Sequence, residues 1–244
     1  MRTSFEIGQR LLLLAVLLVA PAMLSAQDDD GPAFISVRFV DVKPDAGAQF
    51  EAAIKDIGQS LRSGGAPFFH VYQRMRGDMG YTIITQDRAY ANQPAIEISP
   101  TLITRVTSTL NSTRLVTLAI YPELSITGDS VEPEGEFMHV RVRTTSPANR
   151  QGFFDWQKNE LVPALRKAGA TNRRAGRVVA GGNVNTFVDF SYSKRFPQGE
   201  VNLPQAMGQR NFDQMISRAN NLTAAAEDYR YRFRSDLSFT APPQ

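Results

Sequence analysis

Apolar and polar residues follow two different periods in the first part of the chain. Ile35, Val37 and Phe39 alternate with Ser36 and Arg38, which is the two-residue period of a strand. A helix is predicted next, because five apolar residues recur at helical spacing: Phe50, Ala53, Ile54, Ile57 and Leu61. Residues 34–61 therefore predict a strand followed by an amphipathic helix.

The next apolar segments complete a recognisable order of elements. Residues 68–75 and 81–86 predict two strands joined by a turn rich in glycine and aspartate. A further helix is predicted after Pro100, and residues 115–121 predict another strand. The order is βαββαβ, the split βαβ pattern of ferredoxin-like folds.

The same order begins again at Phe137. The predicted elements are a strand over 137–144, a helix over 146–168, a strand pair within 173–191, a helix over 204–219 and a strand over 228–234. The likeness reaches single residues, since "LRSGGA" at residues 61–66 matches "LRKAGA" at 165–170. We therefore predict a first repeat over 34–125, a linker over 126–136 and a second repeat over 137–240.

The N-terminus has the features of an export signal. Arg2 and Arg10 precede the apolar run of residues 11–20, which ends before Pro21 and small residues. We expect residues 1–26 to be a signal peptide and 27–33 a flexible leader of a periplasmic or extracellular protein. The alternative is an uncleaved anchor, but the run is shorter than the roughly 20 apolar residues of a membrane span. No stable membrane insertion is expected after cleavage.

Composition excludes several kinds of site. The signal peptide holds two of the 27 basic and one of the 24 acidic residues, so the mature chain has a formal charge of +2 and no nucleic-acid binding is predicted. The chain has no cysteine, which excludes disulfides and thiolate ligands. It has two histidines without metal-ligand spacing, so no metal site is predicted.

The repeated pattern, with "VKPDAGAQFEAA" at residues 42–53 and "PELS" at 122–125, resembles the dimeric α/β-barrel superfamily. That superfamily includes stress-responsive barrel proteins and antibiotic-biosynthesis-type monooxygenases. The resemblance implies an α+β fold in which two ferredoxin-like units pack sheet to sheet with their helices outside. A tandem chain would complete this barrel alone, so a monomer is expected.

Arginines alternate with apolar residues on the strands of the second repeat. If Val37, Phe39 and their counterparts Val140 and Val142 face the helices, the intervening polar residues face the space between the sheets. The predicted set is Arg38, His139, Arg141, Arg143, Arg230 and Arg232, joined at its edge by Arg234. Converging guanidinium groups would bind a small anion there. The alternative is that these arginines lie on exposed strands and pair with Asp189, Asp228 or Asp236.

Three further residues follow from the resemblance to barrel enzymes. His70, Tyr72 and Trp156 are the residues to suspect in a cofactor-independent oxygenase or a haem-binding or haem-degrading enzyme. His70 has the alternative role of a half-buried strand histidine. Haem is the one cofactor that the resemblance suggests, and the residues alone require none.

Trp156 lies off the apolar stripe of its predicted helix. Pro163 should kink that helix and turn the indole into the core. The alternative is that Trp156 and Phe153 form a contact patch for a partner or close the barrel mouth.

The chain shows no nucleophile motif and no paired catalytic carboxylates. The leading hypothesis is an exported barrel protein that binds a small, anionic molecule between its sheets. The alternatives are the oxygenase or haem enzyme above and an interaction module, and the sequence does not decide whether the protein is an enzyme.

Overall fold

The computed structural model describes residues 33–87, 95–126, 135–195 and 201–242. The predicted signal peptide, nearly all of the predicted leader and most of the predicted linker lie outside these ranges. Within them, no helix is long and apolar enough to cross a membrane.

The predicted order of elements is confirmed in both repeats. The first repeat contains β1 (Ala33–Val42), α2 (Gly47–Ser63), β2 (Phe68–Arg74), β3 (Gly80–Gln86), α3 (Pro100–Ser108) and β4 (Leu110–Ile120). The second contains β5 (Phe137–Thr145), α4 (Arg150–Trp156), a π-helical segment (Gln157–Leu161), α5 (Val162–Lys167), β6 (Arg173–Ala180), β7 (Thr186–Ser193), α6 (Leu203–Met207), α7 (Gln209–Leu222) and β8 (Thr223–Phe233). A short β9 (Phe239–Thr240) follows and pairs with β2.

The two repeats close one antiparallel barrel. Neighbouring strands follow the order β3-β1-β4-β6-β7-β5-β8-β2, and β2 pairs with β3 to complete the ring. Two seams join the repeats: β4 with β6, where Leu118 lies opposite Val178, and β8 with β2, where Phe233 lies opposite Tyr72. A single chain therefore builds the barrel, as the tandem sequence predicts.

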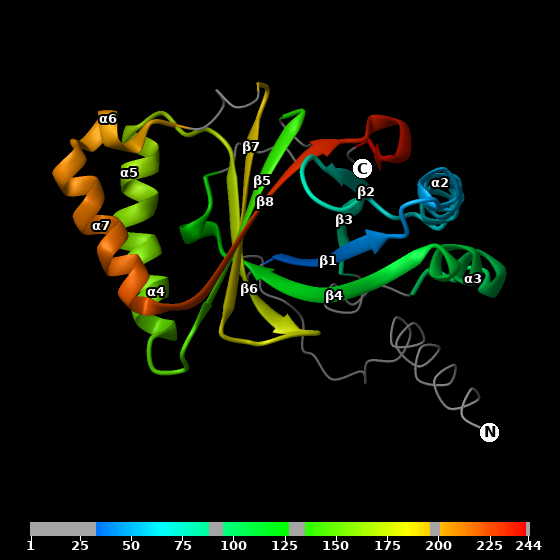
Figure 1. The fold of residues 1–244 in the computed structure, drawn as a ribbon, viewed down its shortest axis with the longest axis horizontal. Helices are drawn as coiled ribbons and strands as arrows, with labels where there is room; N and C mark the ends of the chain where they lie inside the picture. Colours follow the sequence, from blue (N-terminus) through cyan, green and yellow to red (C-terminus); the bar gives the residue numbers. More distant parts are fainter. Residues whose placement is uncertain (1–32, 88–94, 127–134, 196–200, 243–244) are drawn as a thin grey trace.

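Each sheet is covered on its outer face by the helices of its own repeat. Figure 1 shows α2 and α3 on one side of the barrel and α4, α5, α6 and α7 on the other. The first helix layer packs through Phe50, Ala53 and Ile54, the apolar stripe that the sequence predicts. The second layer packs Met215 and Ala219 of α7 onto Phe187 of β7.

The space between the sheets is filled by a mainly apolar core, with His70, Tyr72 and Tyr231 as polar side chains within it. It contains Val37, Phe39, Val140 and Val142 together with inward residues of the other barrel strands. The prediction that these four residues face the helices is therefore wrong, and the arginines between them point outward. The error has a physical cause: both faces of each sheet are covered, so alternation separates two faces without showing which one is inside.

The last strand of each repeat begins earlier than predicted. β4 starts at Leu110 instead of residue 115, and β8 starts at Thr223 instead of residue 228. The added halves pair with β1 and β5, and most of their side chains are exposed. These segments therefore lack the apolar alternation that identifies a strand in sequence.

Trp156 is buried against the second sheet. Its side chain is 8% exposed and its ring centroid lies 5.3 Å from that of Phe153. The π-helical segment begins at the next residue, and Pro163, which has no N–H to donate, lies in the first turn of α5. The prediction that the indole turns into the core is confirmed, with a π-helical segment ahead of Pro163 where a kink at that proline is predicted, and the alternative of an exposed contact patch is wrong.

Candidate functional site

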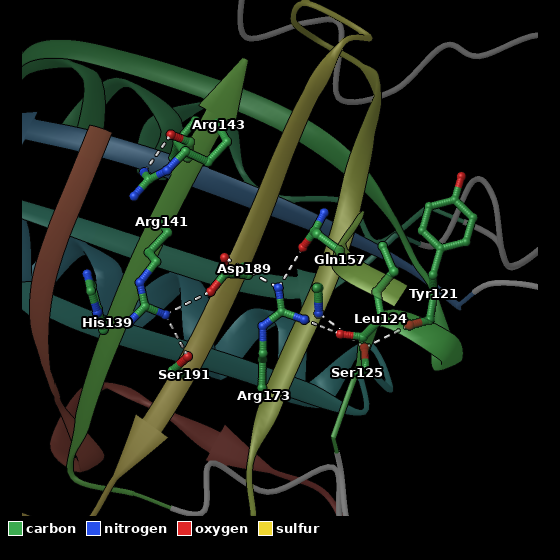
Figure 2. Close-up of polar contacts among 12 residues, drawn as sticks. Tyr121, Leu124, Ser125, His139, Arg141, Arg143, Gln157, Arg173, Asp189 and Ser191 are labelled. Atoms are coloured by element: carbon green, nitrogen blue, oxygen red, sulfur yellow. Dashed lines mark hydrogen bonds and ion pairs between the residues drawn. The ribbon is translucent and has the colours of Figure 1, made fainter. Parts of the chain in front are cut away.

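The outward arginines of the second sheet form a connected polar cluster beneath α4 and α5. Arg141 of β5 donates from Nη1 to Asp189 Oδ1 at 3.2 Å and to Ser191 Oγ at 3.1 Å. Figure 2 shows the Arg141 guanidinium pointing along the sheet toward these two residues of β7. The three side chains share one face because Arg141 lies directly opposite Asp189 in the β5–β7 pairing.

Arg173 extends the cluster toward the helices. Its side chain is almost fully buried, and Nη2 lies 2.6 Å from Oε1 of Gln157 and 3.5 Å from Oδ2 of Asp189. Nη1 donates to the backbone carbonyl of Leu124, in the turn that ends the first repeat. Gln157 begins the π-helical segment and is itself buried, so this helical irregularity places a polar side chain against the sheet (Figure 2).

Asp228 of β8 joins the other side of the cluster. Its Oδ1 lies 3.0 Å from His139 Nε2, and its Oδ2 lies 3.0 Å from Arg143 Nη2. The pairing of the arginines with Asp189 and Asp228, predicted by the alternative to an anion site, is therefore confirmed, but β5 pairs on both sides and these arginines are only partly exposed. We call Arg141, Arg143, Arg173, Asp189 and Asp228 the arginine–aspartate cluster.

Asp189 stays ionised within this cluster. Burial by itself would raise the pKa of the Asp189 carboxyl, but the charges of Arg173 and Arg141 and the hydrogen bond from Arg141 outweigh it and lower the pKa. A buried carboxylate between two guanidinium groups also fixes their positions. The cluster is thus a rigid, charged surface rather than a set of mobile side chains.

A pocket of about 130 Å³ lies between this surface and the helices α5 and α6. Its polar side is formed by His139, Arg141, Arg173, Ser191, Arg230 and Asn172. Its apolar side is formed by Leu165 of α5, Leu203 of α6 and Val201, while Phe137 of β5 lies on the sheet side, on the strand face of His139. No carboxylate is found among the described residues that line it. The pocket therefore presents positive charge on one side and hydrocarbon on the other.

The predicted site residues fall into two groups. His139, Arg141 and Arg230 line this pocket, and Arg143 is connected to them through Asp228. Arg38, Arg232 and Arg234 lie outside it. Arg232 is exposed, pairs with Glu136 at 2.7 Å and lines an open groove at the barrel end. Arg38 lies on the outer face of the first sheet and donates to Thr113 at 3.4 Å.

Arg234 lies on the C-terminal side of β8, between the repeats. It contacts Glu51 of α2 with two nitrogens and Asp236 at 2.8 Å, which confirms its pairing with that aspartate. Arg234 therefore connects the end of the second repeat to the helix of the first.

His70 and Tyr72 lie inside the barrel, apart from Trp156, and neither lines the pocket. Tyr72 is fully buried in the apolar core. His70 lies 4.9 Å from the ring of Phe68 and contacts Thr240 Oγ1 through Nε2 at 2.9 Å. Burial, with a smaller effect of the Arg174 charge, lowers the pKa of His70 to about 4. The interpretation of His70 as a strand histidine with a hydrogen bond is confirmed, but the side chain is buried and not half-buried as predicted.

Sequence reasoning missed Arg173, Ser191 and the apolar side of the pocket. The place of Arg173 could have been predicted. It belongs to a strand pair that the sequence indicates, and it lies directly opposite Ser191 in that pair. In the sequence, Leu165 and Leu203 have the pattern of ordinary core residues. No feature of a sequence distinguishes a leucine that lines a pocket from one that packs in a core.

Solved structures share this fold at low sequence identity. A candidate monooxygenase from Fusobacterium nucleatum superposes with a TM-score of 0.62 and 15% identity, over 83% of this chain and 93% of that one. An anthrone oxidase-like protein gives a TM-score of 0.61 and 12% identity, over 90% and 97% of the two chains. A candidate monooxygenase from Lactobacillus acidophilus gives 0.55 and 11%, over 86% and 96%. What these chains share is the α+β barrel.

Two other comparisons found nothing, since no family model and no curated protein matches the sequence. Chlorite dismutases and a haem-binding protein share the barrel more distantly, at TM-scores of 0.42 to 0.48. Likeness at that level carries no information about a cofactor in this chain.

The two histidines and this pocket do not fit a haem. His70 is packed between aromatic rings inside the barrel, and His139 is held by Asp228. The pocket of about 130 Å³ is also below the roughly 300 Å³ at which pockets for drug-sized ligands begin. No chemistry of the pocket is therefore derived from haem.

Proposed function

We propose that the protein is exported and binds a small anionic molecule in the pocket between the second sheet and the helices α5 and α6. The observation that carries the proposal is the charge of the pocket lining, where guanidinium groups of Arg141, Arg173 and Arg230 occur without a lining carboxylate among the described residues. Guanidinium groups in a partly desolvated space bind carboxylates and phosphates through short, charge-assisted hydrogen bonds.

The rigidity of the cluster supports binding. Asp189 holds Arg141 at 3.2 Å and Arg173 at 3.5 Å before any ligand arrives. Side chains that are fixed in advance lose little entropy when they bind, and this lowers the cost of capture.

The first repeat lacks an equivalent cluster among its described residues. Ser36, Arg38 and Val40 occupy the β1 positions that match His139, Arg141 and Arg143 of β5. One arginine therefore stands where the second repeat places two arginines and a histidine. This difference restricts the proposal to the second repeat.

The experiment is a thermal shift titration with Arg141→Gln as the test variant. A ligand at ten times its Kd stabilises the folded state by about 1.4 kcal/mol, which raises the Tm of a chain of this size by roughly 3–6 °C. We expect such shifts with small carboxylates for the wild type and little or none for Arg141→Gln.

Arg177→Gln is the matched control. Arg177 lies on the outer side of β6, bonded to the Val184 carbonyl, and is not among the residues that line the pocket. This variant should behave as the wild type does. Absence of a shift across carboxylates, phosphate and sulfate in the wild type would refute the proposal.

Oxidation of the bound molecule is a second candidate function. It is favoured by the contact between His139 and Asp228, because a carboxylate that holds an imidazole at a pocket wall is an arrangement found for general bases. The fold likeness to candidate monooxygenases is compatible with it. Oxygen consumption with phenolic acids would test it: turnover that His139→Gln abolishes while binding persists supports the candidate, and no consumption with any bound molecule contradicts it.

A further inference from the structure

We infer that the pocket selects an organic monocarboxylate whose apolar part is no larger than a single six-membered ring, and that Leu165 sets this limit. The inference rests on the proposed function and names its ligand class. It comes from three properties of the pocket: its charge, its apolar side and its volume.

The charged groups at the pocket favour a carboxylate. Arg141, Arg173 and Arg230 line the pocket, and the carboxylate of Asp189 lies 3.2 Å from Arg141 and 3.5 Å from Arg173. A phosphate dianion would be repelled by that carboxylate more strongly than a monoanion is. A planar carboxylate also matches the planar fork of Arg141.

The apolar side requires an organic ligand. Leu165, Leu203 and Val201 face the charged surface across the pocket. Inorganic phosphate or sulfate would leave these side chains without a contact, and the hydrophobic contribution to binding would be lost. An amphipathic acid can place its carboxylate at Arg141 and its hydrocarbon part under Leu165.

The volume limits that hydrocarbon part. The pocket holds about 130 Å³, and an engineered protein cavity of about 150 Å³ accommodates benzene. A single ring or a branched chain of similar size therefore fills the space, and two fused rings exceed it. Leu165 is 9% exposed and belongs to the helix α5, so it forms a fixed wall rather than a mobile cover.

Calorimetric titration with benzoate, benzamide, 2-naphthoate and inorganic phosphate tests the inference. For the wild type we expect benzoate to bind at least tenfold more tightly than 2-naphthoate and phosphate, and benzamide to show no measurable binding. Leu165→Ala removes one wall, so the affinity for 2-naphthoate relative to benzoate should rise at least tenfold.

Leu161→Ala is the control. Leu161 packs against the buried cluster that contains Phe153, Trp156 and Phe187, and it is not among the pocket-lining residues. This variant should leave the affinity ratio unchanged. Leu203→Ala opens the neighbouring wall and replaces Leu165→Ala as the test variant if the latter does not fold.

The results separate this inference from the proposed function. Equal affinity of the wild type for benzoate and 2-naphthoate, phosphate binding as tight as that of benzoate, or an unchanged ratio in the wall variants would overturn the size and class of ligand while leaving an anion site. No binding of any anion would overturn the anion site itself.

Discussion

His70 should make the stability of the barrel depend on pH. Its side chain is 4% exposed, its ring lies between those of Phe68 and Phe233, and its Nε2 contacts Thr240. Burial, with a smaller effect of the Arg174 charge, lowers its pKa from the ordinary 6.5 to about 4. The folded protein therefore keeps this imidazole neutral at pH values where the unfolded chain protonates it.

The sign and size of the effect follow from this difference. Above pH 6.5 both states hold a neutral His70, and its full contribution to stability is present. As the pH falls from 6.5 toward 4, the unfolded state takes up the proton first and stability is lost. A difference of about 2.5 pKa units corresponds to roughly 3 kcal/mol in all, of which about 2 kcal/mol is lost between pH 7 and pH 5.

Urea unfolding of the wild type and of His70→Gln at pH 7 and pH 5 measures this effect. The variant keeps a side chain that can bond Thr240 but does not titrate. Carboxylates contribute equally to both proteins, so the wild type should lose about 2 kcal/mol more than the variant. Losses that agree within about 0.5 kcal/mol would refute the reasoning, because they would mean that His70 titrates normally in the folded protein.

Three substitutions test other parts of the structure. Glu51→Gln weakens the double contact with Arg234, so urea unfolding should show that the free energy of unfolding falls by about 1–3 kcal/mol. The exposed ion pair of Asp56 and Arg105 is the control. Asp56→Asn should lower the free energy of unfolding by under about 1 kcal/mol. Asp189→Asn removes the carboxylate that fixes Arg141 and Arg173, so calorimetry should show at least about threefold weaker benzoate binding together with lower stability, and tighter binding would contradict this. Gly176→Ala would put a Cβ 2.5 Å from the Ala119 carbonyl oxygen in the β4–β6 seam; we expect a cost of about 1–3 kcal/mol, and an unchanged Tm would argue against such close packing.

The sequence was sufficient to predict the barrel. Both repeats show the same order of strand-type and helix-type hydrophobic periods. The match of residues 61–66 with 165–170 indicates that this order is a true repeat and not an accident. Each sheet must be covered on both of its faces. We therefore expect helices to cover one face and the sheet of the neighbouring repeat to cover the opposite face. The seams at Leu118 and Phe233 agree with that prediction.

The sequence was not sufficient to place the site. Alternation grouped His139, Arg141 and Arg143 correctly on one strand face, but it could not show that this face lies under the helices. Both faces of β5 carry residues that become covered, and only the closed barrel shows that Val140 and Val142 point inward. The predicted anion site therefore moves from between the sheets to the outer face of the second sheet.

Long-range contacts explain what else was missed. Gln157 reaches Arg173 because a π-helical segment begins there, and Leu124 reaches the same guanidinium from the first repeat. Neither contact has a local signature, since the residues are 16 and 49 positions apart.

A crystal structure of the protein soaked with selenophene-2-carboxylate, whose ring is no larger than a six-membered ring, would test the central claim most directly. The anomalous signal of selenium locates the ligand without reference to the surrounding density. We predict a peak between β7 and the helices α5 and α6, under Leu165, with the carboxylate at Arg141. A peak between the two sheets, beside Tyr72 or His70, would contradict the outward assignment of the site, and no bound ligand at saturating concentration would contradict the anion pocket.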